Sequence, residues 1–333
     1  MKKIVVNINQ CEKIAEIVKR LKFRPDFLDK EIYTFTSDKE VKARVYFYAT
    51  AICHQTKKLI SKKRRLAGWD YLTKVFIELS NSEPAFLEPK NLKGMDKNKL
   101  ATRLKTLFSD YNGLEHTTLE KAEERAEFLI DCAKVLDKEY SGKVLNLLEK
   151  SNGYLVDDHG LYNLLDEFKA YSDPLKKKSG VFLDFLTTSG IFKIKDPENF
   201  VPIVDYHIQR ILLRMGCIEV NDESLRRKLM NFERIESDEE FRTAAQEVLW
   251  KISKLSGKTL IELDPIFWSL GRSCCHIKTT LCYDKVCDKN PCTFYTYMDL
   301  NNHNKCVFEN VCKGSTDENY RKLLEPNVET YFY

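Results

Sequence analysis

The sequence predicts a mainly α-helical fold, because apolar residues recur at helical spacing along much of the chain and strand-like patterns are short and few. Helix start and stop signals support this class. Only two stretches have the composition of strands: Lys3–Ile8 near the N-terminus and Ile191–Ile194 after Gly190. We therefore expect a helical protein with little sheet.

Two of the predicted helices lie in the first half of the chain. From Glu40 to Leu59 the chain contains neither Pro nor Gly and places apolar residues near helical spacing, which predicts a buried helix. Thr117 and Glu120 have the spacing of a capping box, and apolar residues then recur every three or four positions from Leu119 to Leu136. The second pattern predicts an amphipathic helix.

A third amphipathic helix is predicted from Phe241 to Leu255. Ser237 and Glu240 repeat the capping-box spacing just before it. Gly257 follows the last apolar position and is a natural helix stop.

The composition is that of a globular protein. Of the 333 residues, 43% are hydrophobic and 31% are charged, enough apolar residues for two sub-domains with their own cores. The first residues contain only a short apolar run, far below the roughly 7 to 15 residues of a signal peptide or the roughly 20 of a membrane span. We therefore expect a cytoplasmic protein that does not enter a membrane. Two basic runs, Lys57–Arg65 and Lys176–Lys178, are most simply interpreted as solvated faces.

Cysteines are concentrated towards the C-terminal end, where seven of the eleven lie between Cys274 and Cys312. The cytosol keeps thiols reduced, so clustered cysteines favour a metal site over disulfides. Six residues separate Cys275 from Cys282, and five separate Cys306 from Cys312. Four thiolates suit either an iron–sulfur cluster or zinc.

These spacings resemble the Cys-x6-Cys-x2-Cys-x5-Cys signature that holds a [4Fe-4S] cluster in the helix-hairpin-helix DNA glycosylases of the endonuclease III type. The preceding Trp268–Arg272 also resembles that family's approach to the cluster. Here the middle spacer is the much longer stretch Tyr283–Lys305. The resemblance implies a [4Fe-4S] cluster, with zinc as the alternative. Its expected ligands are Cys275, Cys282, Cys306 and Cys312, and Cys287 and Cys292 are alternate ligands.

A second motif, Val204–Gly216, resembles the Val-Asp-Thr-His-x-x-Arg-x-x-x-Arg element of the same family. There the Asp stabilises the cationic sugar that forms as the base departs, and the resemblance implies this role for Asp205. Breaking an N-glycosidic bond builds positive charge on the deoxyribose, so a nearby carboxylate stabilises the transition state more than the ground state. The same carboxylate is expected to cap a helix over Tyr206–Met215. His207 and Arg210 are expected to be structural or to contact phosphate.

Lys178–Leu183 resembles the Lys-Thr-Ala-x-x-Val of the bifunctional members and the Lys-Thr-x-Val-Phe of archaeal 8-oxoguanine DNA glycosylases. The resemblance implies that Lys178 attacks the sugar carbon to form a Schiff base. Only a neutral amine attacks, and neighbouring cations such as Lys176 and Lys177 lower a lysine pKa. Three exposed lysines on a phosphate-binding loop would give the same pattern. The family's glycine-containing hairpin, whose amides bind phosphate, is replaced by Phe168–Leu175, so lysine side chains are expected to contact phosphate instead.

Two further residues are candidates for contacts with a flipped base. Ala51–Thr56 falls where the family has Leu-Ser-Ala-Gln-Ala-Thr, whose glutamine fills the gap left by the extruded base. Gln55 is the candidate for this wedge, with an ordinary glutamine at a helix end as the alternative. Trp69 can stack on a flipped base or belong to the core.

By the same resemblance, residues 47–192 form a helical barrel domain, and residues 1–46 pack with a C-terminal domain of residues 193–333. The hypothesis is a monomeric DNA glycosylase, with or without a lyase step, that acts in the cytoplasm at the nucleoid on double-stranded DNA with a damaged or modified base. Two alternatives stay open: an N-glycosidase for a modified nucleoside or nucleotide, and a non-catalytic iron–sulfur protein that binds nucleic acid.

Overall fold

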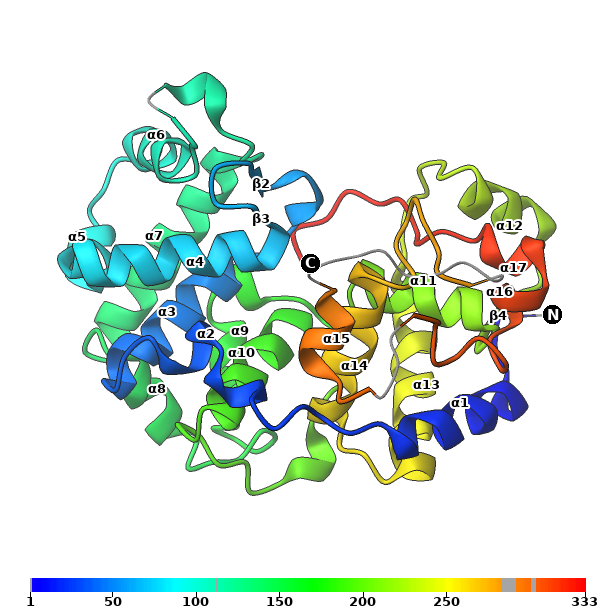
Figure 1. Cartoon of the computed structure of the whole chain (residues 1–333). Coiled ribbons are helices and arrows are strands. Elements are labelled where there is room, and N and C mark those ends of the chain that lie inside the picture. The colour runs from blue at the N-terminus through cyan, green and yellow to red at the C-terminus, as the bar shows by residue number, and fades with distance from the viewer. Residues whose placement is uncertain (1, 112, 283–291, 301–303) are drawn as a thin grey trace. The chain divides into compact units, whose positions relative to one another are not determined.

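The computed structural model describes residues 2–111, 113–282, 292–300 and 304–333 (Figure 1). The fold is mainly helical, with 58% helix and few strands. The chain divides into two compact units, unit 1 of Met1–Leu28 with Val201–Glu329, and unit 2 of Asp29–Phe200 with Thr330–Tyr333. None of the helices described is both long enough and apolar enough to cross a membrane.

Unit 1 combines helices with one short antiparallel sheet. Its elements are β1 (Ile4–Val6), α1 (Ile8–Arg20), α11 (Tyr206–Met215), β4 (Ile218–Val220), α12 (Glu223–Met230), α13 (Glu239–Ser256), α14 (Leu260–Arg272), α15 (Thr293–Tyr297), α16 (Lys313–Thr316) and α17 (Glu318–Arg321).

The core of unit 1 forms where the N-terminal segment meets the later helices. β1 pairs with β4, with Ile4 opposite Val220 and Val6 opposite Ile218. α1 packs on α13, and α11 packs on α14. The buried face of α1 consists mainly of small and aliphatic side chains at helical spacing, so burial of this face holds the N-terminal segment to the C-terminal part of the unit.

Unit 2 is built around helices from the middle of the chain. Its elements are α2 (Glu31–Thr34), α3 (Lys39–Ala51), β2 (Ile60–Ser61), β3 (Leu66–Ala67), α4 (Gly68–Ser82), α5 (Pro89–Leu92), α6 (Lys97–Leu107), α7 (Ala122–Glu139), α8 (Val144–Lys150), α9 (Leu161–Asp166) and α10 (Lys177–Thr188), with short 3-10 turns at Thr56–Lys58, Pro84–Leu87, Leu114–His116, Lys169–Tyr171 and Pro197–Asn199; a further turn, Phe27–Asp29, spans the boundary of the units.

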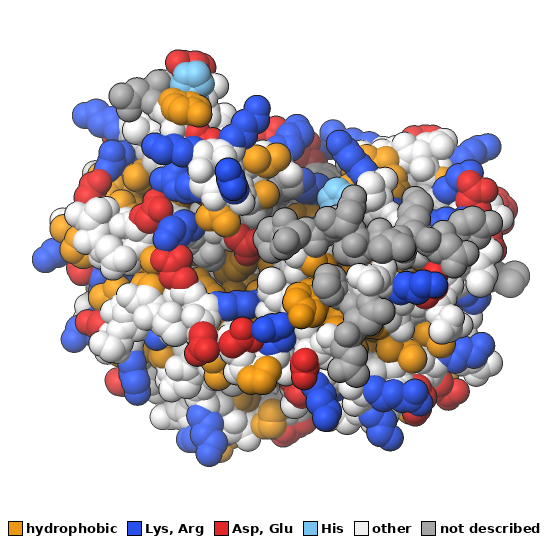
Figure 2. Space-filling view, in the orientation of Figure 1, with side chains coloured by type: hydrophobic (Ala, Val, Ile, Leu, Met, Phe, Trp, Pro, Cys, Tyr) orange, Lys and Arg blue, Asp and Glu red, His pale blue; other side chains and the backbone are white. Residues whose placement is uncertain are grey.

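α3 is the central helix of unit 2, since it packs on α4, α7, α8 and α10 and is buried from Ala43 to Ala51. Phe47 stacks on Tyr171 with ring centroids 5.1 Å apart, and the rings of Phe47 and Phe182 pack edge to face. On the surface, basic side chains gather over the hairpin of β2 and β3 (Figure 2).

The first predicted helix ends earlier than expected. α3 stops at Ala51 instead of continuing to Leu59. The Lys178 ammonium donates to the Ala51 carbonyl at 2.7 Å, and the Arg125 guanidinium donates to the carbonyls of Ile52 and His54. These side chains satisfy carbonyl groups at the helix end, so no further turn is needed to pair them.

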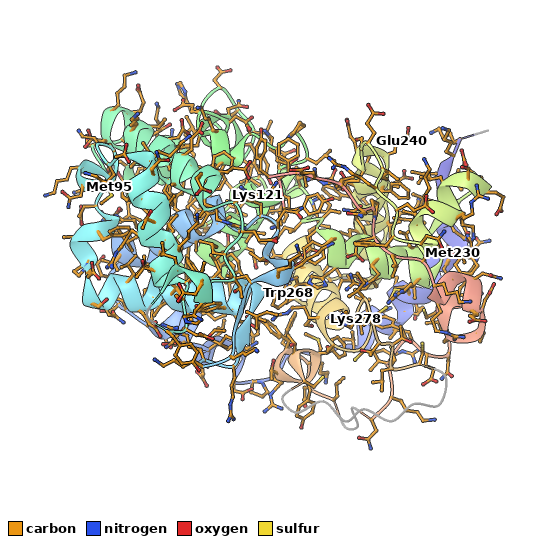
Figure 3. All side chains as sticks on the ribbon, turned by 90° about the horizontal axis from the view of Figure 1, so that it is seen from above. Met95, Lys121, Met230, Glu240, Trp268 and Lys278 are labelled. Atoms are coloured by element: carbon orange, nitrogen blue, oxygen red, sulfur yellow. The ribbon has the colours of Figure 1, made fainter. Side chains whose placement is uncertain are left out.

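Both predicted capping boxes are wrong, although both helices exist. α7 begins at Ala122 after Lys121, labelled in Figure 3, whose backbone is left-handed and provides no side-chain cap. Thr117 instead donates to the Phe108 carbonyl at 3.0 Å, and Glu120 pairs with Lys58. α13 likewise begins without a side-chain cap, whereas its predicted stop at Gly257 is confirmed.

A capping box does form at α14, where Thr259 and Glu262 cap each other's backbone N–H groups. A Thr or Ser followed three residues later by Glu is therefore a weak signal in this chain. Near α7, bonds of Thr117 and Glu120 to distant residues take the place of the capping box.

The predicted strand near the N-terminus is confirmed as β1, whereas Ile191–Ile194 is not a strand. Ile191 and Phe192 instead donate their N–H groups to the Leu186 carbonyl at the end of α10. The boundaries between the two units differ from the expected ones at 46/47 and 192/193. Unit 2 starts at Asp29, and unit 1 resumes at Val201.

Candidate functional site

Lys178 lies at the second residue of α10 and is fully buried in unit 2. Its ammonium donates to the Ala51 carbonyl at 2.7 Å and sits 5.0 Å from the centroid of the Phe128 ring. Tyr331, from the C-terminal segment that packs in the same unit, covers Phe128 with ring centroids 5.3 Å apart. Lys178 is therefore a buried amine beside the Phe128 ring, paired with a backbone carbonyl rather than with a carboxylate.

This environment makes neutral Lys178 accessible near physiological pH. Burial, together with the nearby charges of Lys177 and Arg125, lowers the pKa of Lys178 to about 7. The Lys177 ammonium in turn lies 3.3 Å from the Cys53 sulfur in the same buried region. Desolvation lowers the Lys178 pKa more than the neighbouring lysine that the sequence pointed to.

Lys176 and Lys177, the candidate phosphate contacts, are both engaged within unit 2. Lys176 pairs with Asp166, and Lys177 is buried. Asp173 organises the turn before α10, because its carboxylate accepts the N–H groups of Leu175 at 3.1 Å and of Lys177 at 2.8 Å. These two N–H groups are therefore already paired within unit 2.

Gln55 and Trp69 both lie near the surface of unit 2, on either side of the β2–β3 hairpin. Gln55 has a left-handed backbone (φ 50°), and its N–H donates to the Tyr333 carbonyl at 3.1 Å. Trp69 lies in the first turn of α4, half-buried, and stacks on Phe185 at 5.2 Å. Both residues are partly exposed, and the Gln55 side-chain amide also donates to the Tyr333 carbonyl, at 3.4 Å.

Arg125 is a buried residue that the sequence analysis missed. It interrupts the apolar stripe of α7, donates to three backbone carbonyls and contributes to the lowered pKa of Lys178. A single arginine on the apolar face of a predicted helix is the signal that could have found it.

No protein-family model and no curated protein sequence matches this chain.

In unit 1, Asp205 caps α11 and is nearly buried, with 8% of its surface exposed. Its Oδ1 atom accepts the N–H groups of His207 at 2.7 Å and Ile208 at 3.0 Å. Gly271 of α14 lies against α11 so closely that an added Cβ would stand 2.8 Å from the His207 Cβ. The close approach of two helices therefore fixes the start of α11 and the carboxylate on it.

Arg210 is a structural residue of unit 1. Its guanidinium is buried and donates to the Glu325 carboxylate at 2.7 Å and to the Gly271 carbonyl at 2.8 Å. It also lies 2.9 Å from the His207 Nδ1 atom, so it orients that ring. Of the two roles expected for Arg210, the geometry favours the structural one.

The four predicted metal ligands gather around the end of α11. The Arg214 guanidinium lies 3.5 Å from the Cys275 sulfur, and the Arg214 carbonyl lies 3.5 Å from the Cys312 sulfur. Cys282 contacts the carbonyl of Gly314, two residues after Cys312, at 3.9 Å. Burial raises the pKa of the Cys306 thiol, and Cys275, Cys312 and Cys282 raise it further through their charges. All four thiols therefore lie in one region of unit 1.

The alternate ligand Cys292 has another partner. A hydrogen bond with Cys274 lowers the pKa of the Cys292 thiol to about 5. Cys287 lies outside the described residues. Within the described part of the chain, no group of three or more His, Cys, Asp or Glu side chains is arranged to hold a metal ion. The four gathered thiols would have to turn towards a common centre to bind one.

The residues named from the sequence thus form two groups, each within one compact unit. Lys178, Gln55 and Trp69 belong to unit 2, and Asp205 and the gathered cysteines belong to unit 1.

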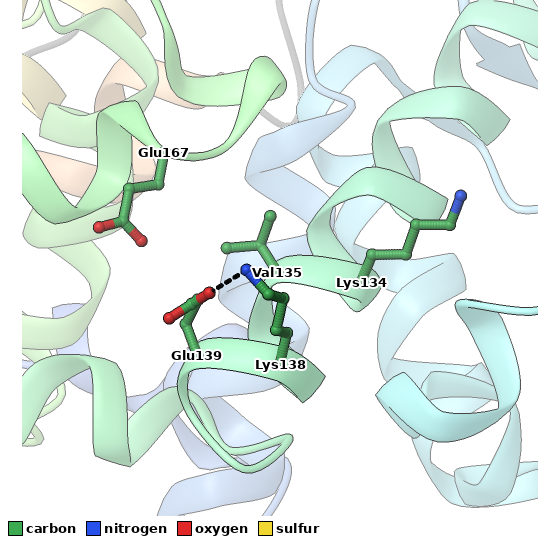
Figure 4. Close-up of a pocket in the computed structure, with 5 residues that line it drawn as sticks. All are labelled: Lys134, Val135, Lys138, Glu139 and Glu167. Atoms are coloured by element: carbon green, nitrogen blue, oxygen red, sulfur yellow. Dashed lines mark ion pairs between the residues drawn. The ribbon is translucent and has the colours of Figure 1, made fainter.

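A cavity of about 430 Å³ at the end of α7 contains none of these residues (Figure 4). It is lined by Lys134, Val135, Lys138, Glu139 and Glu167, and its Lys138 and Glu139 form an ion pair. Its charged groups are balanced among themselves, so it offers no net charge for an anionic ligand.

Proposed function

We propose that this protein is a base-excision DNA glycosylase that draws a damaged or modified base out of the duplex and cleaves its N-glycosidic bond, with Lys178 supplying a lyase step. The observation that carries the proposal is the fully buried Lys178 amine at the start of α10, with its pKa lowered to about 7. A buried lysine of this kind is costly to a fold and is typical of an amine nucleophile.

The chemistry follows from the two candidate side chains. Neutral Lys178 attacks the sugar C1′, and the base departs with the electron pair of the glycosidic bond and takes a proton from solvent. The lysine nitrogen then releases its proton, and opening of the C1′–O4′ bond with protonation of O4′ leaves an iminium between lysine and sugar. The Asp205 carboxylate stabilises the positive charge that builds on the sugar during this step. Lys178 must give up its bond to the Ala51 carbonyl to reach the sugar.

We also propose that the two units correspond to the two domains of the endonuclease III-like fold. Three features of the chain support this assignment. The candidate nucleophile begins a helix of unit 2, the candidate aspartate begins a helix of unit 1, and the N-terminal segment clusters with the C-terminal part of the chain.

The gathered thiols fit a metal centre by their chemistry, since four cysteine sulfurs are the donor set of both [4Fe-4S] clusters and structural zinc. Cys275, Cys282, Cys306 and Cys312 would hold it. When bound, it would supply structural stability to the segment after α14. The Arg214 guanidinium, which contacts the Cys275 sulfur, would then offset part of the negative charge of the thiolates.

Anaerobically purified protein is expected to absorb near 400 nm, as roughly expected for a cluster of this class, and to contain iron and acid-labile sulfide in equal amounts. Cys306→Ser should lose the absorbance, because its thiol lies among the other three. Cys132→Ser is the matched control, a fully buried cysteine of unit 2. Bound zinc without this absorbance would show that the site holds zinc instead of a cluster. Protein that contains neither iron nor zinc would contradict the proposed metal site.

One observation favours a second candidate function. Because Asp173 occupies the backbone donors before α10, this turn does not offer them to DNA phosphate. An N-glycosidase for a free modified nucleoside would not need that phosphate site. The non-catalytic alternative would keep the scaffold and the metal centre without the chemistry.

A panel of substrates tests these functions. The protein is incubated with duplex oligonucleotides that each carry one oxidised, deaminated or alkylated base, and with the corresponding free nucleosides. We expect release of at least one base from duplex DNA and none from nucleosides. Release from nucleosides alone would favour the second candidate, and release from neither would contradict both catalytic candidates.

A further inference from the structure

The hairpin of β2 and β3 presents an unusual group of cations. Lys62, Lys63 and Arg65 lie exposed in its four-residue turn, and none of the three has a carboxylate partner among the residues that the structure describes. Arg64, between them, is paired with Glu78 at 2.9 Å. Figure 2 shows basic side chains over these elements.

The turn is held rigidly. The Asp110 carboxylate accepts the N–H groups of Lys62 at 2.7 Å and Lys63 at 3.2 Å, and it bonds the Ser61 hydroxyl. Arg65 adopts a left-handed backbone (φ 54°), which is strained for a residue other than glycine.

The first strand is anchored as well. The Thr118 hydroxyl bonds both the N–H and the carbonyl of Ile60, at 2.8 Å and 2.9 Å. A strained, clamped turn that holds three unpaired cations together costs free energy in the isolated protein. An anionic partner would offset that cost.

Two observations favour nucleic acid as the partner. The Leu175 and Lys177 N–H groups before α10 already donate to Asp173, so this turn does not offer them to a phosphate and the exposed hairpin cations are the better candidates for contacting the DNA backbone. The hairpin is also flanked by Gln55 and Trp69, which have the side-chain chemistry to contact bases. A membrane partner is less suited, because Ile60 is the exposed large apolar side chain of the hairpin.

We propose that the β2–β3 hairpin binds the phosphate backbone of duplex DNA through Lys62, Lys63 and Arg65. The choice of DNA as partner rests on the proposed function, whereas the binding itself requires no catalysis. The hairpin supplies sequence-independent affinity and positions Gln55 and Trp69 over the bases.

The test measures the affinity of the full chain for a duplex with an uncleavable abasic analogue, at several salt concentrations. Each phosphate contact contributes about 0.9 to the slope of log K against log salt. Lys62→Gln with Lys63→Gln and Arg65→Gln is expected to lower that slope by about 2 to 3 and to weaken binding at least tenfold. The control is Lys90→Gln with Lys99→Gln and Lys134→Gln, three exposed lysines of unit 2, which removes the same charge.

An unchanged slope in the hairpin variant, or an equal change in the control, would overturn the proposal. Loss of binding to phosphatidylserine vesicles without any loss on DNA would also overturn it, in favour of a membrane. Thermal unfolding of both triple variants should match the wild type, since the substituted side chains are exposed. Hairpin-dependent DNA binding without any base release would leave this inference standing while the proposed glycosylase activity fails.

Discussion

Lys178→Ala is expected to abolish covalent trapping of the protein on abasic DNA by borohydride. Borohydride reduces the iminium between lysine and sugar to a stable amine, so the adduct reports the nucleophile directly. We expect trapping to fall by roughly 1000-fold or more. Lys177→Ala is the matched neighbour, because it is also buried, and it should retain an adduct. An undiminished adduct in Lys178→Ala would move the nucleophile to another residue.

The pH dependence of trapping gives a second check on the same residue. Burial lowers the pKa of Lys178 to about 7. The single-turnover rate should therefore rise about tenfold per pH unit below pH 7 and level off above it, as the amine becomes neutral. A lysine with an ordinary pKa would give a rate that keeps rising to about pH 10.

The pH dependence of the free energy of unfolding measures the cost of burying this amine independently of its role in catalysis. The folded chain binds the Lys178 proton less tightly than the unfolded chain, because burial lowers the pKa from 10.5 to about 7. Below pH 7 the buried amine is charged and lowers the free energy of unfolding by its full amount. This loss of stability disappears as the pH rises towards 10.5. Lys178→Met should therefore be more stable than the wild type at pH 6 in urea unfolding, and this advantage should shrink by pH 10.

The helices of this fold could be predicted where the determinants are local. Tyr206–Met215 was predicted with its cap Asp205 and is present at those residues, because the cap, the apolar spacing and Gly216 all lie within one segment. The end of α3 could not be predicted, since it depends on Arg125 and Lys178, which lie far along the chain. The β2–β3 hairpin was missed because a run of basic residues hides its strands and Asp110 clamps its turn from a distance.

The candidate site shows the same division. Sequence spacing named the four thiols that gather at the end of α11, but not the arginine that contacts two of them. The burial of Lys177 and Lys178 was not predictable, because consecutive lysines ordinarily lie in solvent. Asp173 was also missed, since its role depends on the turn that it forms.

Asp205→Asn is expected to reduce base release by about 100-fold to 1000-fold, the loss typical of removing one group that stabilises a charged transition state. The substitution removes the negative charge from the carboxylate at the start of α11. Asparagine caps helices about as well as aspartate, so it can keep the bonds to the N–H groups of His207 and Ile208. The measurement is the single-turnover rate on the best duplex substrate, with affinity for the uncleavable duplex measured beside it.

Asp205→Ala is the informative comparison, because it removes both the charge and the cap. It should lose about as much activity as Asp205→Asn and, in addition, about 1 kcal/mol of stability from the lost cap. If Asp205→Asn instead kept wild-type rates while Asp205→Ala lost stability and rate together, the carboxylate would serve only to start α11. The transition-state charge would then have to be stabilised by another residue, and the resemblance at Val204–Gly216 would extend to the helix start but not to its chemistry.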